Sequence, residues 1–476
     1  MAMIAGLSVL SLARFQFAMT TVFHFFFVPF SIGMALVTAI METRYVRTKN
    51  EMYKKMTKFW GRIFLLSFAV GVVTGIIQEF QFGMNWSNYS RFMGDIFGAP
   101  LAIEALLAFF MESTFIGLWM FTWDRFKPAA HAALIWFVWL GTTLSAIWIL
   151  SANSFMQHPT GFAINQATGR VKLVNFMAVI SNPQLWVEFP HVVFGAFVTA
   201  AFAVSGMSAW RILKHDHVEF YKKSMRIGLT IGLVASIGVV AVGDLQTRFM
   251  MNDQPMKFAA TEGIYKDTKD PAPWAVVELI DTKNHTVKDN VDVPYLLSLL
   301  SYHKMSGSVK GMDTVNKELE KKYGANKNYY VPVKTLFWSF RVMAGIGTGL
   351  IIGAAAVLWF SRKKKDTIEN KRWLLYLTGL ALWLPFIANT AGWFITELGR
   401  YPWVVYGLYT IADAVSPTTT AGELLFTNIV YFLIFSLLGG VMIYYSHRVL
   451  VKGPDGPLDT DYGVAKDPFA KEAFAK

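Results

Sequence analysis

Four residues in or beside apolar stretches of the sequence are of types that bind iron. His24 lies among phenylalanines, His191 opens an apolar stretch, Met343 lies inside another, and Glu397 ends a fourth. A histidine and a methionine together can hold a low-spin haem iron and raise its potential. A histidine between membrane helices is also often only a hydrogen-bond donor, methionine is usually a packing residue, and an interfacial acid can simply face water. The residues alone leave these interpretations open.

Three further ionisable residues lie in apolar surroundings, where a charge is costly and needs a reason. Glu104 and Glu112 are eight residues apart, which in an α-helix places them about 80° apart around the axis and about 12 Å apart along it. Two carboxylates at stepped depth indicate a proton relay, although neighbouring polar side chains could also cap both. Arg341, two residues before Met343, needs an anionic partner, and a haem propionate would serve.

The composition favours a membrane protein over a soluble one. Of the 476 residues, 54% are hydrophobic and 16% are charged, and the mean hydropathy is +0.39. Soluble domains carry charge at about a quarter of their positions. Cysteine is absent, which excludes disulfides, thiolate-ligated clusters and covalently attached c-type haem.

Nine stretches are apolar and long enough to approach the roughly 20 residues that a helix needs to cross a bilayer. The second and sixth are short, and we expect them to extend into their flanks. The first is too long for the apolar part of a signal peptide, so we expect it to be retained. The sequence therefore predicts an all-α integral membrane protein of about nine transmembrane helices, centred on Phe17–Ile40, Ile63–Ile77, Ile96–Trp123, Ala132–Ser151, Val192–Trp210, Ile227–Gly243, Val342–Ser361, Trp373–Thr396 and Leu424–Ser446.

Lysine and arginine are concentrated in alternate connections between these stretches. The connections at 43–62, 123–130, 211–226 and 361–372 are rich in both, and the last of them contains Lys363, Lys364 and Lys365. Because cytoplasmic loops carry an excess of these residues, we predict an outer N-terminus and a cytoplasmic C-terminus. The net charge of +12 thus follows membrane topology and does not indicate a nucleic-acid partner.

One outer connection, residues 246–334, is long, polar and interrupted by prolines. A loop of this length is either functional or disordered. The predicted organisation is helices one to six in 1–245, this loop in 246–334, helices seven to nine in 335–450, and a cytoplasmic tail in 451–476. By this topology His24, His191, Met343, Glu397 and Glu104 all lie toward the outer face, which predicts a redox site near that surface.

Five strings of residues closely resemble subunit I of cytochrome bd-type quinol oxidases. The strings are long and specific, and the resemblance runs from about Phe15 to about Ser446. We therefore identify the chain as a member of this family, on the strings Met41–Gly61, Gln78–Trp86, Asp95–Glu104, Phe110–Phe115 and Gly392–Glu397.

The resemblance implies three haem groups, which are a low-spin haem b, a high-spin haem b and a haem d. His191 and Met343 would ligate the iron of the low-spin haem. His24 would ligate one high-spin haem and Glu397 the other, and the resemblance does not decide which of these is haem d. Trp393, one helical turn before Glu397, matches a family tryptophan beside the haems.

In the loop, Lys257 and Glu262 match a lysine and a glutamate that the family associates with quinol oxidation. The resemblance implies that quinol is oxidised at the outer face and that dioxygen is reduced to water at the high-spin haem pair. Protons would come from the cytoplasm, through Glu104 and Glu112, so charge would be separated without a pump. A second large membrane subunit, a small single-helix subunit and a bacterial plasma membrane are also implied.

The sequence departs from the family pattern at two places. Tyr401 stands where the family usually has glutamine, so no role is carried over to it. The outer loop lacks a long C-terminal insertion, which is typical of a short-loop branch. The alternative function is an ion-coupled secondary transporter, whose intramembrane acids would bind cations and whose spans would show paired repeats. We find no such repeat.

Overall fold

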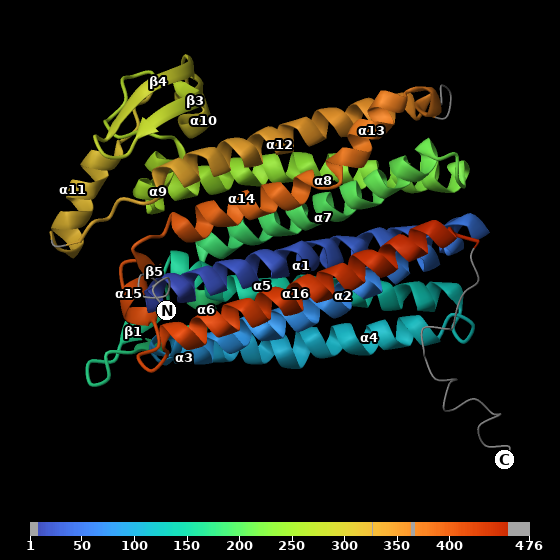
Figure 1. Cartoon of the computed structure of the whole chain (residues 1–476), viewed down its shortest axis with the longest axis horizontal. Coiled ribbons are helices and arrows are strands. Elements are labelled where there is room, and N and C mark those ends of the chain that lie inside the picture. The colour runs from blue at the N-terminus through green and yellow to red at the C-terminus, as the bar shows by residue number, and fades with distance from the viewer. Residues whose placement is uncertain (1–7, 326, 363–366, 456–476) are drawn as a thin grey trace.

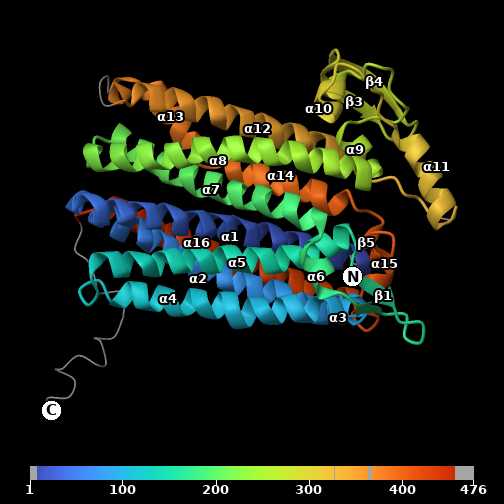
Figure 2. The ribbon, with the colours of Figure 1, turned by 180° about the vertical axis from the view of Figure 1, so that it is seen from behind.

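Nine helical segments in the computed structural model are long and apolar enough to cross a membrane, within the described residues 8–325, 327–362 and 367–455. They lie side by side in one elongated bundle (Figures 1 and 2). Each covers a predicted span, except that the third ends at Phe121 and the seventh at Phe360, slightly before the predicted ends at Trp123 and Ser361. The second and sixth extend into their flanks as expected. The segments are α1 (Val9–Thr48), α2 (Glu51–Met84), α3 (Ser87–Ile103) with η1 (Glu104–Phe109) and α4 (Phe110–Phe121), α5 (Pro128–Gln157), α7 (Pro183–Leu213), α8 (Val218–Asp253), α12 (Val333–Phe360), α13 (Arg372–Ala381) with α14 (Leu384–Leu398), and α16 (Ala421–Lys452).

The two ends of the bundle differ. The end where α1 begins, here called the loop end, carries short elements: β1 (Phe162–Ile164), β2 (Val171–Leu173), α6 (Phe176–Ile180), β5 (Trp403–Val405), β6 (Tyr409–Thr410) and α15 (Ile411–Ala414). The opposite end has the basic connections and the short helix η2 (Ile368–Asn370). Lys363, Lys364 and Lys365, and most of the predicted tail at 451–476, lie outside the described residues. Which end faces the cytoplasm stays a prediction.

The long connection between α8 and α12 is more regular than its prolines suggested. α8 continues to Asp253, so the connection begins later than position 246. It contains α9 (Pro255–Thr261), an antiparallel hairpin of β3 (Trp274–Asp281) and β4 (Thr286–Val293), α10 (Leu296–Tyr302) and α11 (Met312–Tyr323). Both strands contain several valines around a short turn, a hairpin signal that the sequence analysis did not use.

Two predicted spans are not continuous α-helices. α13 ends at Ala381 because Pro385 has no N–H to donate to the carbonyl of Ala381. In the third span the segment Glu104–Phe109 is a π-helix, with i→i+5 bonding. The predicted angle of about 80° around the axis between Glu104 and Glu112 assumed a continuous α-helix. Because the segment between them is a π-helix, that prediction was wrong. Such π segments frequently occur at functional sites.

α1 and α7 are the most buried of the nine segments, and they cross at a glycine. A Cβ on Gly33 would lie 2.2 Å from the carbonyl oxygen of Ala196 and 2.6 Å from the Cβ of Ala200. Small residues that permit close backbone approach are the usual basis of helix association in membranes. This contact joins the first four spans to the following group α7, α8, α12 and α14.

Candidate functional site

An apolar cavity of about 330 Å³ lies at the loop end between α1 and α14. Three charged side chains also line it, from Arg14, Glu397 and Arg400. An apolar pocket with a few convergent polar groups is the usual form of a cofactor site. Much of its wall is aromatic and includes Phe17, Phe25, Phe82, Trp86, Trp393 and Phe394.

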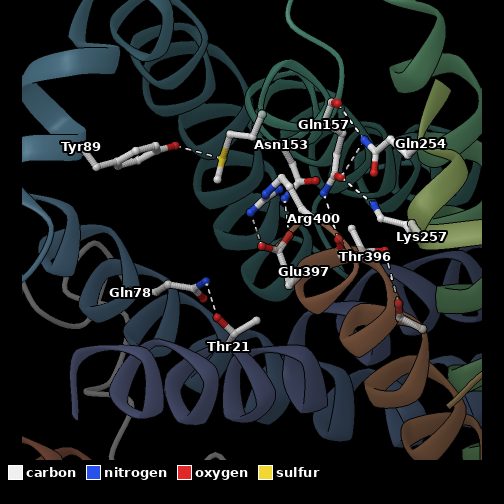
Figure 3. A network of polar contacts seen from close by, with 12 residues as sticks. Thr21, Gln78, Tyr89, Asn153, Gln157, Gln254, Lys257, Thr396, Glu397 and Arg400 are labelled. Carbon is white, nitrogen blue, oxygen red and sulfur yellow. Dashed lines mark hydrogen bonds and ion pairs between the residues drawn. The ribbon is translucent and has the colours of Figure 1, made fainter. Parts of the chain in front are cut away.

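The last turn of α14 places Glu397 in the wall of this cavity. The side-chain amide of Asn153 donates to Glu397 Oε1 at 2.9 Å, and the guanidinium of Arg400 pairs with Oε2 (Figure 3). Arg400 is 3% exposed, yet its Nε and Nη1 have no partner within the described part of the chain. Buried polar groups without partners are costly, so an anionic group in the cavity would be stabilised there.

Glu188 on α7 extends this arrangement. Its Oε2 accepts hydrogen bonds from Gln184 Nε2 at 3.1 Å and Ser154 Oγ at 3.2 Å, while its buried Oε1 has no partner among the described residues. The Oδ1 of Asn153 is also buried and unpartnered in that part of the chain. We call the group the open cluster, defined as Asn153, Glu188, Glu397 and Arg400.

The rings of Trp393 and His24 both lie close to the ring of Phe25. The Trp393 ring stacks on the Phe25 ring with centroids 4.4 Å apart, which joins α14 to α1. His24 faces α2, where its Nδ1 lies 3.0 Å from Thr74 Oγ1. Its Cε1 lies 2.9 Å from the position that a Cβ atom would take if Gly75 carried a side chain. With Nδ1 oriented in this way, Nε2 is the nitrogen left for a metal.

His191 and Met343 belong to one helix group but face different neighbours within it. The His191 ring on α7 packs against Gly243 of α8, where an added Cβ would lie 3.2 Å from Cε1. Its Nδ1 is buried and has no partner in the described residues. The Met343 sulfur on α12 faces Gly392 of α14, 3.1 Å from where a Cβ would stand. Each histidine therefore faces a glycine on the next spanning helix.

Arg341 finds its anionic partner within the chain. Its Nη2 lies 3.0 Å from Glu262 Oε2, and the guanidinium also donates to the carbonyl oxygens of Thr261 and Ala275. The two side chains are 7% and 3% exposed. Burial raises the pKa of Glu262, although the nearby Arg341 charge opposes this.

Lys257 points toward Gln157 at the end of α5 (Figure 3). It is 5% exposed, and its Nζ donates to Gln157 Oε1 at 2.8 Å. Burial, together with the nearby Arg400 charge, lowers the pKa of Lys257 to about 7. The structure therefore brings Lys257 to α5 and Glu262 to α12, and the two do not share a hydrogen-bond partner.

Glu104 and Glu112 both face α5 despite the π-helix between them. Ser145 Oγ donates to Glu104 Oε1 at 2.6 Å, and Glu112 Cγ would lie 2.8 Å from a Cβ on Gly141. Ser145 and Gly141 are one turn apart on α5, about 6 Å along the axis. Glu104 lies near the middle of the helical segment Ser87–Phe121, and Glu112 lies nearer the opposite end of the bundle. The depth of each acid in the membrane stays a prediction.

A second buried acid lies toward the opposite end. Glu42 Oε1 is 2.6 Å from His131 Nδ1, and Glu42 Oε2 accepts from Trp119 Nε1 at 2.7 Å. His131 Nε2 lies 2.9 Å from the carbonyl oxygen of Trp119. We call this group the closed cluster, defined as Glu42, Trp119 and His131, because each of these side-chain nitrogens and oxygens has a partner.

Residues 12–454 match the family model for cytochrome bd terminal oxidase subunit I. The chain belongs to this family. It is 53% identical to cytochrome bd ubiquinol oxidase subunit 1 of Bacillus subtilis over 98% of this chain and 99% of the relative. It is 35% identical to cytochrome bd-II ubiquinol oxidase subunit 1 of Escherichia coli over 94% of this chain and 97% of the relative. The solved bd oxidase of Geobacillus thermodenitrificans superposes with a TM-score of 0.85 at 26% identity, covering 94% of this chain and 99% of that chain.

Membership of the cytochrome bd family confirms the predicted all-α membrane architecture and the predicted quinol oxidase function. It rejects the alternative of an ion-coupled transporter. It also implies haem cofactors, a complex with other subunits and a multi-pass membrane location. The individual haem types and ligands stay predictions.

The loop-end cavity fits a haem of a cytochrome bd protein. Its aromatic wall suits the flat macrocycle, Glu397 supplies a carboxylate, and the unpartnered nitrogens of Arg400 suit a propionate. Sequence reasoning missed Arg400, Gln157 and the roles of Glu188 and Asn153. The sequence offered only a weak signal for these residues. Arg400 and Glu188 are charged and lie within four positions of a candidate ligand, whereas the amides Gln157 and Asn153 form no recognisable sequence pattern.

Proposed function

We propose that this chain carries the redox centres of a quinol:dioxygen oxidoreductase at its loop end. His191 and Met343 would hold the iron of a low-spin haem b, and His24 and Glu397 would each hold one of two high-spin haems, a b and a d. The observation that carries the proposal is the cavity beside Glu397, with an aromatic wall and a buried, partly unpaired Arg400. When bound, the haems supply electron transfer and the site of dioxygen reduction.

The overall reaction converts two quinols and one dioxygen into two quinones and two waters. Four electrons and four protons leave the quinols, and four protons enter the waters. The chain's part is to orient the ligands, exclude water and supply protons at defined places. Trp393 stacked on Phe25 fixes one wall of the cavity, and Asn153 fixes the Glu397 carboxylate.

We place quinol oxidation at the loop, beside Lys257 and Glu262. Burial raises the pKa of Glu262, which suits a group that must take a proton from a quinol hydroxyl. The Arg341 charge next to it favours the carboxylate between turnovers. One relative is named a ubiquinol oxidase subunit and another a putative menaquinol oxidase subunit.

We propose that protons for dioxygen reduction pass from Glu112 to Glu104 along the face of α5. Both acids contact that helix, and Glu112 is nearer the basic, opposite end. That end would face the cytoplasm of a bacterial plasma membrane, with the loop end outside. Quinol would then release protons on one side while water formation draws them from the other. A second large subunit and a small single-helix subunit would complete the enzyme.

A pyridine haemochrome analysis of the purified complex, with its reduced-minus-oxidised spectrum, tests this proposal. We expect b-type and d-type bands, with Met343→Leu converting the low-spin haem to high spin or lowering its potential. A wild-type complex without a low-spin band, or unchanged low-spin spectra in Met343→Leu and His191→Ala, would refute the ligand assignment.

A further inference from the structure

The last residue of α5 joins the loop helix α9 to the turn that carries Glu397 (Figure 3). Gln157 is fully buried, and its side-chain carbonyl accepts from Lys257 Nζ at 2.8 Å. Its side-chain amide donates to the carbonyl oxygen of Thr396 at 3.3 Å. Its main-chain carbonyl accepts from Gln254 Nε2 at 2.7 Å. One residue thus bonds the start of the loop and the residue immediately before Glu397.

A second contact from the same helix holds the carboxylate itself. Asn153 is one turn before Gln157 on α5, so both side chains lie on the same face of the helix. Asn153 donates to Glu397 Oε1 at 2.9 Å. The last turn of α5 therefore fixes both the backbone before Glu397 and the orientation of its side chain.

Close packing limits independent movement of α9 and the end of α14. A Cβ on Gly399 would lie 2.5 Å from Lys257 Cγ and 2.7 Å from its Cε. The Lys257 stem thus lies directly on the backbone two residues after Glu397. A displacement of Lys257 must change this contact, the hydrogen bond to Gln157, or both.

We propose that Gln157 is a positioning residue that transmits the state of loop helix α9 to the Glu397 carboxylate. Quinol binding at the loop would thereby change how Glu397 ligates its haem. The inference rests on the proposed function, because it takes Lys257 as part of the quinol site and Glu397 as an iron ligand. Both halves of the amide are required: the carbonyl holds Lys257, and the N–H group holds Thr396.

Coupling between two positions is measured by the non-additivity of their substitutions. The experiment measures carbon monoxide affinity and the visible spectrum of the reduced high-spin haems in the purified complex, for wild type, Lys257→Met, Gln157→Leu and the double variant. We expect each single variant to change the carbon monoxide dissociation constant roughly fivefold, the effect of one lost buried hydrogen bond. The double variant should change it no further than either single variant.

Two matched variants make the result specific. Gln157→Glu keeps the acceptor for Lys257 but loses the donor to Thr396, so it should reproduce the Gln157→Leu shift even if the leucine variant folds poorly. Gln16→Leu removes an equally buried amide, which bonds Thr427 of α16 at 2.7 Å, and it should leave the carbon monoxide affinity unchanged.

Independent effects, with the double variant shifted roughly 25-fold as the product of two fivefold changes, would overturn the inference. So would normal affinity in both Gln157 variants. A wild-type complex that lacks high-spin haem bands would instead refute the proposed function. The two failures are therefore distinguishable.

Discussion

Two of the buried acid clusters among the described residues, the closed and the open cluster, differ in how fully their polar atoms are paired. In the closed cluster both oxygens of Glu42 and both ring nitrogens of His131 have partners. In the open cluster Asn153, Glu188 and Arg400 each have a buried atom without a partner among the described residues. Unpaired polar atoms are costly in apolar surroundings, so we expect a ligand to complete the open cluster, whereas the closed cluster needs none.

The sharpest contrast between the clusters comes from removing the central acid of each. Glu397→Ala should abolish the bands of one high-spin haem. Glu42→Ala should keep all haem bands per folded complex but lower the free energy of unfolding by about 3 kcal/mol, because it leaves a buried histidine and tryptophan unpaired. Spectra and thermal melting of both variants in detergent provide the measurement. Loss of haem bands in folded Glu42→Ala would show that the closed cluster is also a haem site.

The next largest effect concerns the acids that face α5. Glu104→Gln should slow oxidase turnover roughly 100-fold and Glu112→Gln roughly tenfold, since a positioned proton donor contributes at least this much. Neither change should prevent reduction of the low-spin haem by quinol. Liposomes of known orientation allow proton uptake to be followed during a single oxidation by dioxygen. Normal uptake and turnover in Glu112→Gln would make that acid structural, like Glu42, and would require protons to enter elsewhere.

A smaller and more selective effect is expected in the loop. Glu262→Gln should reduce quinol oxidation roughly tenfold, the loss of a modest proton acceptor, and leave dioxygen reduction by an artificial one-electron donor intact. Glu318→Gln, on the surface of α11 in the same connection, serves as the control because its side chain is half exposed and bonds Lys310. An equal fall of both activities in Glu262→Gln would remove quinol oxidation from this site.

Periodicity and hydropathy predicted all nine spanning segments, because a membrane helix is defined by local composition. The breaks in the α-helix within two of these segments were harder to predict from the sequence. Pro385 could have predicted the end of α13, whereas no residue in Glu104–Phe109 signals a π-helix. Residue types supplied the candidate ligands and the resemblance assigned them to haems, but neither predicted that Lys257 bonds Gln157 and that Glu262 pairs with Arg341. These directions depend on partners far away in the sequence, because α9 packs against α12 and Lys257 bonds the end of α5.

Two histidines test most directly whether incomplete hydrogen bonding distinguishes ligand sites from structural clusters. His191 has a buried nitrogen without a partner in the described part of the chain, whereas both nitrogens of His131 are bonded. The measurement is the reduced-minus-oxidised spectrum of His191→Ala and His131→Ala complexes, normalised to folded protein. We predict loss of the low-spin haem band in His191→Ala and its retention in His131→Ala. A retained band in His191→Ala, or its loss in folded His131→Ala, would contradict it.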